Sequence, residues 1–386
     1  MISANYSQKK IKTLAVDLEP APYKSDLWNA FHKSNNFDIF VIYTESKNWA
    51  KDGGHDFQQL PENNYRYIIY SGKGLIGVIQ SSWSVMVQIL RGDYDLVYIS
   101  GYSSLPTIFA LVFSSITRKK FILHVDFLNN GLPNGRFKVI KITIRDIFRG
   151  LVRKYGLALL VCGKKGVESA KIDKFSMEKI IDFPYVIDVD RIKSDMPKKI
   201  PPIDEYIHNS DITKIFFSGR MIHRKGLRTL LEALSKLNNK TWVLWIEGDG
   251  LEIEAYKDFA KELNIDSKCV FLGFCQYDTH SYLVRSADIV VVPSLEDPWG
   301  IVVDEGLQLG KAVVSSDATG SGFDRIKHNE NGVIFPAGNV NELFKSLDTL
   351  LSDRVLRKTI GENAKKWDGN MKPIDNCMAI ESIVKL

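Results

Sequence analysis

Short apolar runs alternate with amphipathic stretches along the whole chain, a pattern typical of parallel sheets covered by helices. In the first half of the chain, the apolar runs predict strands at residues 12–17, 37–43, 95–100, 120–125 and 157–163. The stretches between them predict helices, of which the clearest are at residues 24–35, 74–91 and 142–154. Residues 105–116 are the most apolar helical stretch, but a bilayer takes about 20 residues to cross, so we expect a buried helix there.

A polar, proline-bearing segment at residues 197–211 interrupts this alternation and is predicted to be a linker. Beyond it, the apolar runs predict strands at residues 214–219, 242–248, 268–273, 288–294 and 312–316. The fold class is therefore α/β, with two Rossmann-like doubly wound domains at residues 1–196 and 212–366. Ligands of such sheets bind beyond the carboxyl ends of the strands, so we expect the chemistry in the loops that follow these runs.

Two cations follow the first strand of the second domain. Arg220 comes directly after Gly219, and Lys225 stands a short loop later, where a helix begins. Cations and unsatisfied backbone amides at a helix N-terminus together stabilise phosphate, so the segment predicts a diphosphate site. Both side chains should then lie at a ligand-facing surface, and their replacement by alanine should leave the fold intact. The alternative is that they are surface charges beside a turn.

An acidic loop and a helix form the second signal, in the segment PSLEDPWGIVVDEGLQ. Gly300 lets the backbone approach a ligand closely, and the amides of Ile301 and Val302 lie at the start of the helix. Asp297 and Glu305 are eight residues apart, and carboxylates accept strong hydrogen bonds from sugar hydroxyls. One carboxylate is predicted to bind a donor sugar and the other a ribose, unless Asp297 only caps the helix and Glu305 is only exposed.

Together these segments resemble the C-terminal half of the retaining GT-B glycosyltransferases of the family-four type, the glycosyl transferases group 1. The resemblance covers roughly residues 212–340, and it depends on five signals in the family's order, GRMIHRKG, IEGDG, FLGF, ADIVVVPS and DPWGIVVDEGLQLGKAVV. It implies two Rossmann-like domains that face a central cleft, with the donor held mainly by the C-terminal domain. It also implies that the last segment, residues 367–386, packs back on the N-terminal domain as a helix.

The resemblance further implies roles for individual residues. Arg220 and Lys225 bind the diphosphate of a nucleotide-sugar donor and assist catalysis, and Glu305 binds its ribose. The other donor contacts implied are Gly219, Phe274, Glu296, Asp297, Gly300, Ile301 and Val302. The family commonly has glutamate where this chain has Asp297, so either Asp297, counted among the catalytic residues, or the adjacent Glu296 contacts the donor sugar.

The N-terminal half resembles the family more faintly. His124 stands at the position of the family's histidine that lines the donor-sugar site, which makes it a catalytic candidate, although a histidine at a strand end is often structural. The first strand leads into the segment EPAPYKSDLWNA, where many members of the family have a pair of glycines. Close approach of that loop to a donor is therefore not predicted.

No metal or cofactor is expected. The pairs Asp93 with Asp95 and Asp188 with Asp190 have the spacing that binds a divalent cation in another glycosyltransferase fold, but both lie in the N-terminal half, where the GT-B fold holds none. The diphosphate would instead be neutralised by side chains and helix N-termini. In the retaining mechanism that the resemblance implies, the leaving phosphate oxygen accepts the acceptor's proton, so no protein base is nominated.

The net charge of +5 is unevenly distributed. Residues 1–200 hold 29 Lys and Arg against 19 Asp and Glu, whereas residues 201–386 hold 22 against 27. The excess includes a basic stretch from Arg118 to Lys154, which suits a nucleic acid, an anionic membrane surface or a phosphorylated acceptor, if it is not simply a solvated face. Of these partners, no nucleic acid is expected, and the resemblance implies a glycan or lipid-linked acceptor in cell-surface polysaccharide assembly.

The four cysteines are scattered, and no secretory apolar segment follows the polar first ten residues, so we expect a cytoplasmic protein, on the inner face of the membrane if it is peripheral. Two alternatives remain open: a GT-B-fold sugar-nucleotide epimerase or hydrolase, and a catalytically inactive partner subunit. A dinucleotide-dependent oxidoreductase is excluded, because no Gly-x-Gly-x-x-Gly fingerprint follows the first strand.

Overall fold

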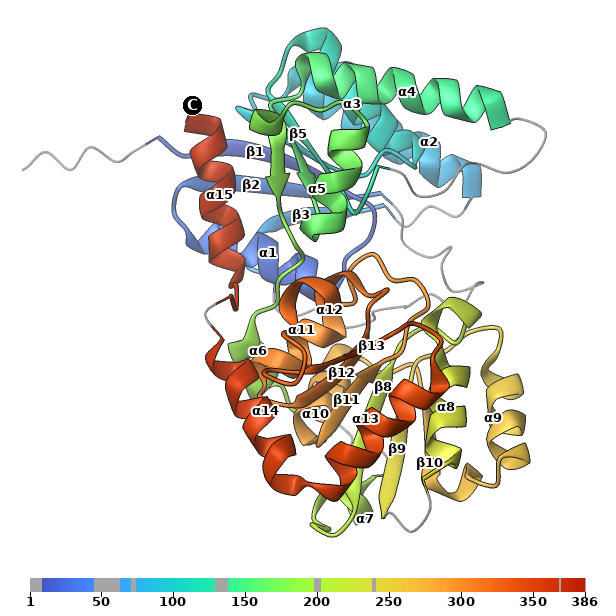
Figure 1. The fold of residues 1–386 in the computed structure, drawn as a ribbon. Helices are drawn as coiled ribbons and strands as arrows, with labels where there is room; N and C mark the ends of the chain where they lie inside the picture. The colour runs from blue at the N-terminus through green and yellow to red at the C-terminus, as the bar shows by residue number, and fades with distance from the viewer. Residues whose placement is uncertain are drawn as a thin grey trace, which may run out of the picture. The chain divides into compact units, whose positions relative to one another are not determined.

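The computed structural model describes residues 9–44, 63–70, 74–128, 138–197, 203–237, 241–367 and 369–385. These residues form two compact units (Figure 1). The first unit holds the described residues up to Pro184 together with those from Pro373 onward, and the second holds those from Tyr185 to Lys372.

The first unit is built on a parallel sheet with the strand order β3-β2-β1-β4-β5-β6-β7. Its strands are β1 (Ile11–Asp17), β2 (Phe37–Tyr43), β3 (Arg66–Ile69), β4 (Leu96–Ser100), β5 (Phe121–Val125), β6 (Ala158–Val161) and β7 (Ile180–Asp182). The inner strands are nearly all apolar because both faces of a parallel sheet are buried under helices.

Helices cover both faces of the first sheet. They are α1 (Pro22–Lys33), α2 (Gly74–Arg91), α3 (Leu105–Thr117), α4 (Lys138–Tyr155), α5 (Gly163–Ile172) and α15 (Pro373–Lys385), with a short 3-10 turn at Met177–Lys179. One apolar core joins α1 and α15 to the sheet through Trp28, Phe31 and Ile380. The other joins α2, α3 and α4 to the opposite face through Val85, Leu111 and Val152.

The second unit holds another parallel sheet, with the order β10-β9-β8-β11-β12-β13. Its strands are β8 (Thr213–Ser218), β9 (Trp242–Glu247), β10 (Cys269–Gly273), β11 (Ile289–Val292), β12 (Ala312–Ser316) and β13 (Val333–Phe335). Its helices are α6 (Val189–Ser194), α7 (Asp204–Ile207), α8 (Leu227–Ser235), α9 (Ile253–Glu262), α10 (Tyr277–Ser286), α11 (Ile301–Gln308), α12 (Gly320–Arg325), α13 (Val340–Ser352) and α14 (Arg354–Lys366), with 3-10 turns at His223–Lys225 and Asp266–Lys268. Two apolar cores again lie on the two faces of the sheet.

The prediction of two doubly wound α/β domains is confirmed, and each apolar run named above contains a strand. The structure adds the edge strands β3, β7 and β13, which are three or four residues long and too short to give a clear periodic signal. Within the predicted linker, residues 198–202 lie outside the described residues, Ile203 is fully buried in the second unit, and α7 follows it. Among the described residues, no helix combines the length and apolar character needed to span a membrane.

Candidate functional site

The candidate site lies at the carboxyl edge of the second sheet, at the point where its strand order reverses. From β8 the chain proceeds outward to β9 and β10 on one side, and then to β11, β12 and β13 on the other. The loops that follow β8 and β11 therefore diverge at this point, and a crevice at such a position is where open α/β sheets bind ligands. Backbone bonds join the two loops, since the Arg224 carbonyl accepts from the amide of Leu295 at 2.8 Å.

Both predicted cations are in the loop after β8. Arg220 is half-buried, and Lys225 ends the 3-10 turn that precedes α8. Gly226 then begins α8 with a positive φ of 72°. A Cβ atom at Gly226 would lie 1.9 Å from the carbonyl oxygen of Pro293, so only glycine lets the two loops approach this closely.

Lys225 and Asp297 form an ion pair across the two loops. The Lys225 Nζ donates to Asp297 Oδ2 at 2.6 Å, and the two side chains are only 18% and 8% exposed. Ser294 Oγ also donates to Asp297 Oδ2, at 3.3 Å. Glu296, by contrast, is exposed. Of the two neighbouring carboxylates, Asp297 is therefore the one that lies beside the predicted phosphate-binding lysine.

Gly300 introduces α11 in the left-handed conformation, with φ of 80°. Its carbonyl accepts from Ser321 Oγ at 2.8 Å, and a Cβ atom there would lie 2.5 Å from Thr319 Cγ2 and 3.4 Å from Asp297 Oδ2. The first turn of α11 thus starts next to Asp297. Its leading residues, Ile301 and Val302, are partly exposed, which places the unsatisfied amides of a helix N-terminus at the site.

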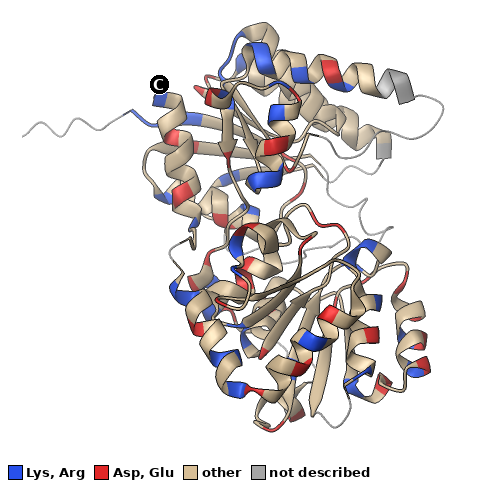
Figure 2. Cartoon of the chain, in the orientation of Figure 1, with Lys and Arg blue, Asp and Glu red and all other residues tan. Residues whose placement is uncertain are grey.

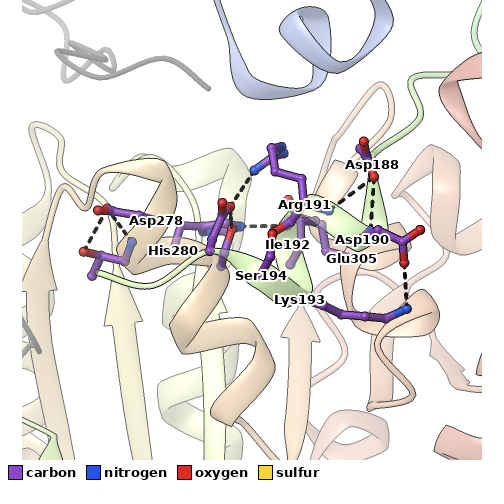
Figure 3. A network of polar contacts seen from close by, with 12 residues as sticks. Asp188, Asp190, Arg191, Ile192, Lys193, Ser194, Asp278, His280 and Glu305 are labelled. Carbon is purple, nitrogen blue, oxygen red and sulfur yellow. Dashed lines mark hydrogen bonds and ion pairs between the residues drawn. The ribbon is translucent and has the colours of Figure 1, made fainter. Parts of the chain in front are cut away.

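Glu305 is held one turn into α11 by His280 from α10 (Figure 3). His280 Nε2 lies 2.8 Å from Glu305 Oε2, and His280 Nδ1 lies 2.6 Å from Glu247 Oε2 at the end of β9. All three side chains are largely buried. Burial alone would lower the pKa of His280, but the two flanking carboxylates raise it well above its ordinary value. The histidine is therefore a cation between two anions at neutral pH.

Sequence reasoning missed Glu247 and His280. Glu247 lies inside the IEGDG segment, which we used only as one of the five signals of the family resemblance. His280 is a single polar residue in an amphipathic helix. No local spacing links them to Glu305, because β9, α10 and α11 are separate elements that only the folded sheet brings together.

A second set of contacts that the sequence did not predict holds the first turn of α11 through Asp304. Asp304 is buried, accepts from the Trp299 indole nitrogen at 2.8 Å and pairs with Arg325 Nε at 3.1 Å. Burial raises the pKa of Asp304 to about 6, and Arg325 opposes that rise. The pair fastens the first turn of α11 to α12.

His124 lies in the other unit, at the end of β5, and is 4% exposed. Its Nδ1 contacts the Tyr98 hydroxyl at 2.5 Å, and its Nε2 lies 3.7 Å from Cys162 Sγ. Burial lowers the pKa of His124 to about 3, so the ring is neutral. Its partners in the structure are core residues of its own unit, and a role toward the donor sugar stays a prediction.

Phe274 follows β10, two strands away from β8 in the sheet, and is half-buried. Its role toward a donor also stays a prediction.

The acidic pairs have structural partners. Asp93 pairs with Lys12 Nζ at 2.7 Å, and Asp95 accepts from the Lys12 amide. Asp188 caps α6 by accepting from the amides of its first turn, and Asp190 pairs with Lys193. Across the described ranges, no group of three or more His, Cys, Asp and Glu side chains is arranged to hold a metal ion.

The part of the chain that holds this site is similar to known glycosyltransferases. Residues 203–367 match the sequence profile of the glycosyl transferases group 1. A Methanocaldococcus jannaschii protein described as an uncharacterized glycosyltransferase is 36% identical over 178 residues, which are 44% of this chain and 45% of that protein. The lipopolysaccharide core biosynthesis glycosyltransferase LpsE of Rhizobium meliloti is 28% identical over 209 residues, 53% of this chain and 56% of that protein. The chain thus matches about half the length of these curated relatives.

Solved structures show the same fold over nearly the whole chain. Anabaena HepE in complex with UDP and glucose has a TM-score of 0.73 at 17% identity, and the match covers 97% of this chain and all of that one. WaaG, a glycosyltransferase involved in lipopolysaccharide biosynthesis, has a TM-score of 0.68 at 16% identity, over 96% of this chain and 99% of that one. The GT-B fold expected from the resemblance is therefore confirmed.

Proposed function

We propose that this chain, whose residues 203–367 match the glycosyl transferases group 1, transfers a sugar from a nucleoside-diphosphate sugar to an acceptor hydroxyl. The observation that carries this proposal is the Lys225–Asp297 pair at the reversal point of the second sheet. It joins a phosphate-binding cation to a sugar-binding carboxylate between the N-termini of α8 and α11. The complex of HepE with UDP and glucose supports a donor of this class.

In the proposed reaction, Arg220 and Lys225 bind the diphosphate, Glu305 binds the ribose, and Asp297 contacts the donor sugar. Negative charge grows on the diphosphate as the bond to the sugar breaks, so the cations and the amides of the helix N-termini stabilise the transition state more than the bound donor. The acceptor hydroxyl enters on the face from which the diphosphate leaves, and its proton passes to the leaving phosphate oxygen. The sugar thereby retains its anomeric configuration without a dedicated protein base.

We propose that this charge compensation requires no metal ion. A diphosphate needs cationic partners, and Arg220 and Lys225 provide them in the same loop as the amides that begin α8. The acidic side chains closest to Lys225 and His280 are already engaged with those cations.

For the acceptor, we propose a lipid-linked glycan at an anionic membrane surface. The similarity to LpsE, a lipopolysaccharide core biosynthesis enzyme, supports a cell-surface glycan. Part of the basic stretch is exposed, since Arg118 and Lys154 both lie over the ring of Tyr155 at the surface. Arg149 is instead buried against Asp173 at 2.9 Å and takes no part in docking. Arg136 and the side chains of Lys138 and Lys141 lie outside the described residues.

Helix α2 supports the same proposal through its apolar surface. Between Gly74 and Leu90 it contains no charged residue (Figure 2), and its small residues Gly77, Ser81 and Ser82 face inward. Val85 and Ile89 are also buried, whereas five large apolar side chains are exposed, Leu75, Ile76, Ile79, Trp83 and Leu90. A helix that exposes so many large apolar side chains suits the headgroup region of a membrane, where aromatic and aliphatic side chains insert.

Titration with UDP, GDP and ADP tests the proposed donor class, followed by an assay for release of the nucleoside diphosphate from the matching sugar nucleotides. A charge-assisted hydrogen bond contributes roughly 1.5–3 kcal/mol, so Arg220→Ala should weaken binding about 10- to 100-fold. Arg354→Ala, at an exposed position of α14, is the matched control and should bind as the unmodified protein does. The proposal is wrong if none of the three nucleotides binds, or if Arg220→Ala binds as tightly as the control.

A further inference from the structure

His280 occupies the centre of a charged triad formed by three separate elements. Its two ring nitrogens contact Glu247 from β9 and Glu305 from α11, while Phe216 from β8 packs near its ring, with the centroids 5.9 Å apart. Asp278, which lies on the same helix as His280, accepts a hydrogen bond from the Thr279 amide. The charged groups that face His280 are therefore Glu247 and Glu305.

This arrangement needs the protonated histidine. A neutral imidazole donates through one nitrogen only and would present a lone pair to one of the carboxylates, whereas the imidazolium donates to both. The cation also attracts both carboxylates, Glu247 and Glu305, which lie on opposite sides of one ring in a largely buried place. Within the described part of the chain, Glu305 uses only Oε2 for its hydrogen bond.

We propose that His280 is a positioning residue for ribose recognition, because its hydrogen bond holds the Glu305 carboxylate in a single orientation. The inference deepens the proposed function and rests on it, since Glu305 is the residue proposed to bind the ribose. A ribose hydroxyl donates best to an ionised carboxylate that does not have to be ordered on binding. With His280 bonded to Oε2, Glu305 keeps Oε1 for the ligand and cannot rotate away.

Contacts with α6 and Asp195 also hold α10 in place. Ser281 Oγ donates to Asp195 at 2.8 Å, and Arg191 pairs with the same carboxylate at 2.8 Å. Arg285 donates to the carbonyl of Ile192 at 3.0 Å. Helix α6 and the residue that follows it therefore hold α10 in place next to His280. Figure 3 shows α6 residues such as Arg191 and Ile192 in the same network as His280.

The test compares a nucleotide with its analogue that lacks the ribose hydroxyls. The unmodified protein is first titrated with UDP, GDP and ADP to find the nucleotide that binds most tightly. That nucleotide and its 2′,3′-dideoxy form are then titrated against the unmodified protein, Glu305→Gln, His280→Gln and the double variant. The unmodified protein should prefer the nucleotide by about 10-fold or more. Each variant should lose most of that preference, and the double variant should lose no more than Glu305→Gln alone, because both substitutions remove one interaction. His208→Gln, at an exposed histidine, makes the same chemical change as a control and should keep the preference.

A purely structural role for His280 would lower the melting temperature and leave the ratio of the two affinities unchanged, and that result would overturn the inference. If Arg220→Ala also leaves nucleotide binding unchanged, the proposed function fails as well; if Arg220→Ala weakens binding but His280→Gln keeps the ribose preference, only this inference fails.

Glu247→Gln provides a second route in case His280→Gln does not fold. It keeps both His280 and Glu305 but removes one of the two charges that raise the histidine pKa. His280 should then lose its proton at a lower pH than it does in the unmodified protein. When the pH is raised, the ribose preference of Glu247→Gln should therefore disappear earlier than that of the unmodified protein. An identical pH profile in Glu247→Gln and the unmodified protein would contradict the proposal.

Discussion

Replacement of Lys225 by alanine should destabilise the second unit, whereas the same change at Arg220 should not. From the sequence alone, both substitutions are expected to leave the fold intact. The structure separates them, because Lys225 Nζ lies 2.6 Å from Asp297, whose side chain is only 8% exposed. Without the lysine, that carboxylate would remain buried beside Ser294, its other hydrogen-bond partner.

The expected cost follows from this burial. Removing one partner of a buried ion pair costs about 3–5 kcal/mol, and the 18% exposure of Lys225 favours the lower end. For a domain of this size, 1 kcal/mol corresponds to roughly 2–4 °C, so Lys225→Ala should melt about 6–12 °C lower. The double variant Lys225→Ala/Asp297→Asn removes the stranded charge and should recover most of the loss. Thermal melting of the three variants measures this effect, and a Lys225→Ala protein that melts with the unmodified one would refute the reasoning.

Two further predictions concern the cofactor and the membrane. Turnover should persist in EDTA, because the diphosphate charge is assigned to Arg220, Lys225 and helix N-termini; loss of turnover that magnesium or manganese restores would contradict this assignment. In sedimentation at low salt, the protein should bind vesicles that contain anionic lipid, and Ile79→Ser/Trp83→Ser should weaken that binding, because each buried apolar side chain contributes about 1.5–3 kcal/mol. If the unmodified protein and the double variant bind the vesicles equally, α2 is not the contact. Ile374→Ser on α15 changes another exposed apolar residue and serves as the control.

The sequence predicted the sheets well because most of the parallel strands are buried on both faces and leave apolar runs. It also predicted the loops that hold the candidate site, since Gly226 and Gly300 mark two places where the backbone is left-handed directly before a helix. It did not predict the pairing of Lys225 with Asp297. Those residues are 72 positions apart in the chain, and only the adjacency of β8 and β11 brings their loops together.

The basic stretch shows a different limit of sequence reasoning. Composition counts Arg149 and Lys154 equally, yet one is buried in an ion pair and the other is exposed over an aromatic ring. The apolar pattern of α2 was correctly interpreted as a helix, but the pattern alone did not indicate which face turns inward. The buried residues of α2 include small ones, Gly77, Ser81 and Ser82, beside Val85 and Ile89, whereas five large apolar side chains are left exposed.

The pair of Lys225 and Asp297 also bears on how the proposed reaction would begin. A lysine already bonded to a carboxylate must share its protons when a diphosphate arrives, so part of the attraction for the diphosphate offsets the loss of that bond. The carboxylate released in this exchange lies 3.4 Å from where a Cβ of Gly300 would be, at the start of α11, and is then available to accept from a sugar hydroxyl. A nucleoside diphosphate that carries a sugar can satisfy both partners, whereas a bare diphosphate satisfies only the lysine and leaves Asp297 unpaired. The site should therefore favour the intact donor over its product, and Asp297→Asn should remove that difference, because the asparagine has no charge to be left unpaired.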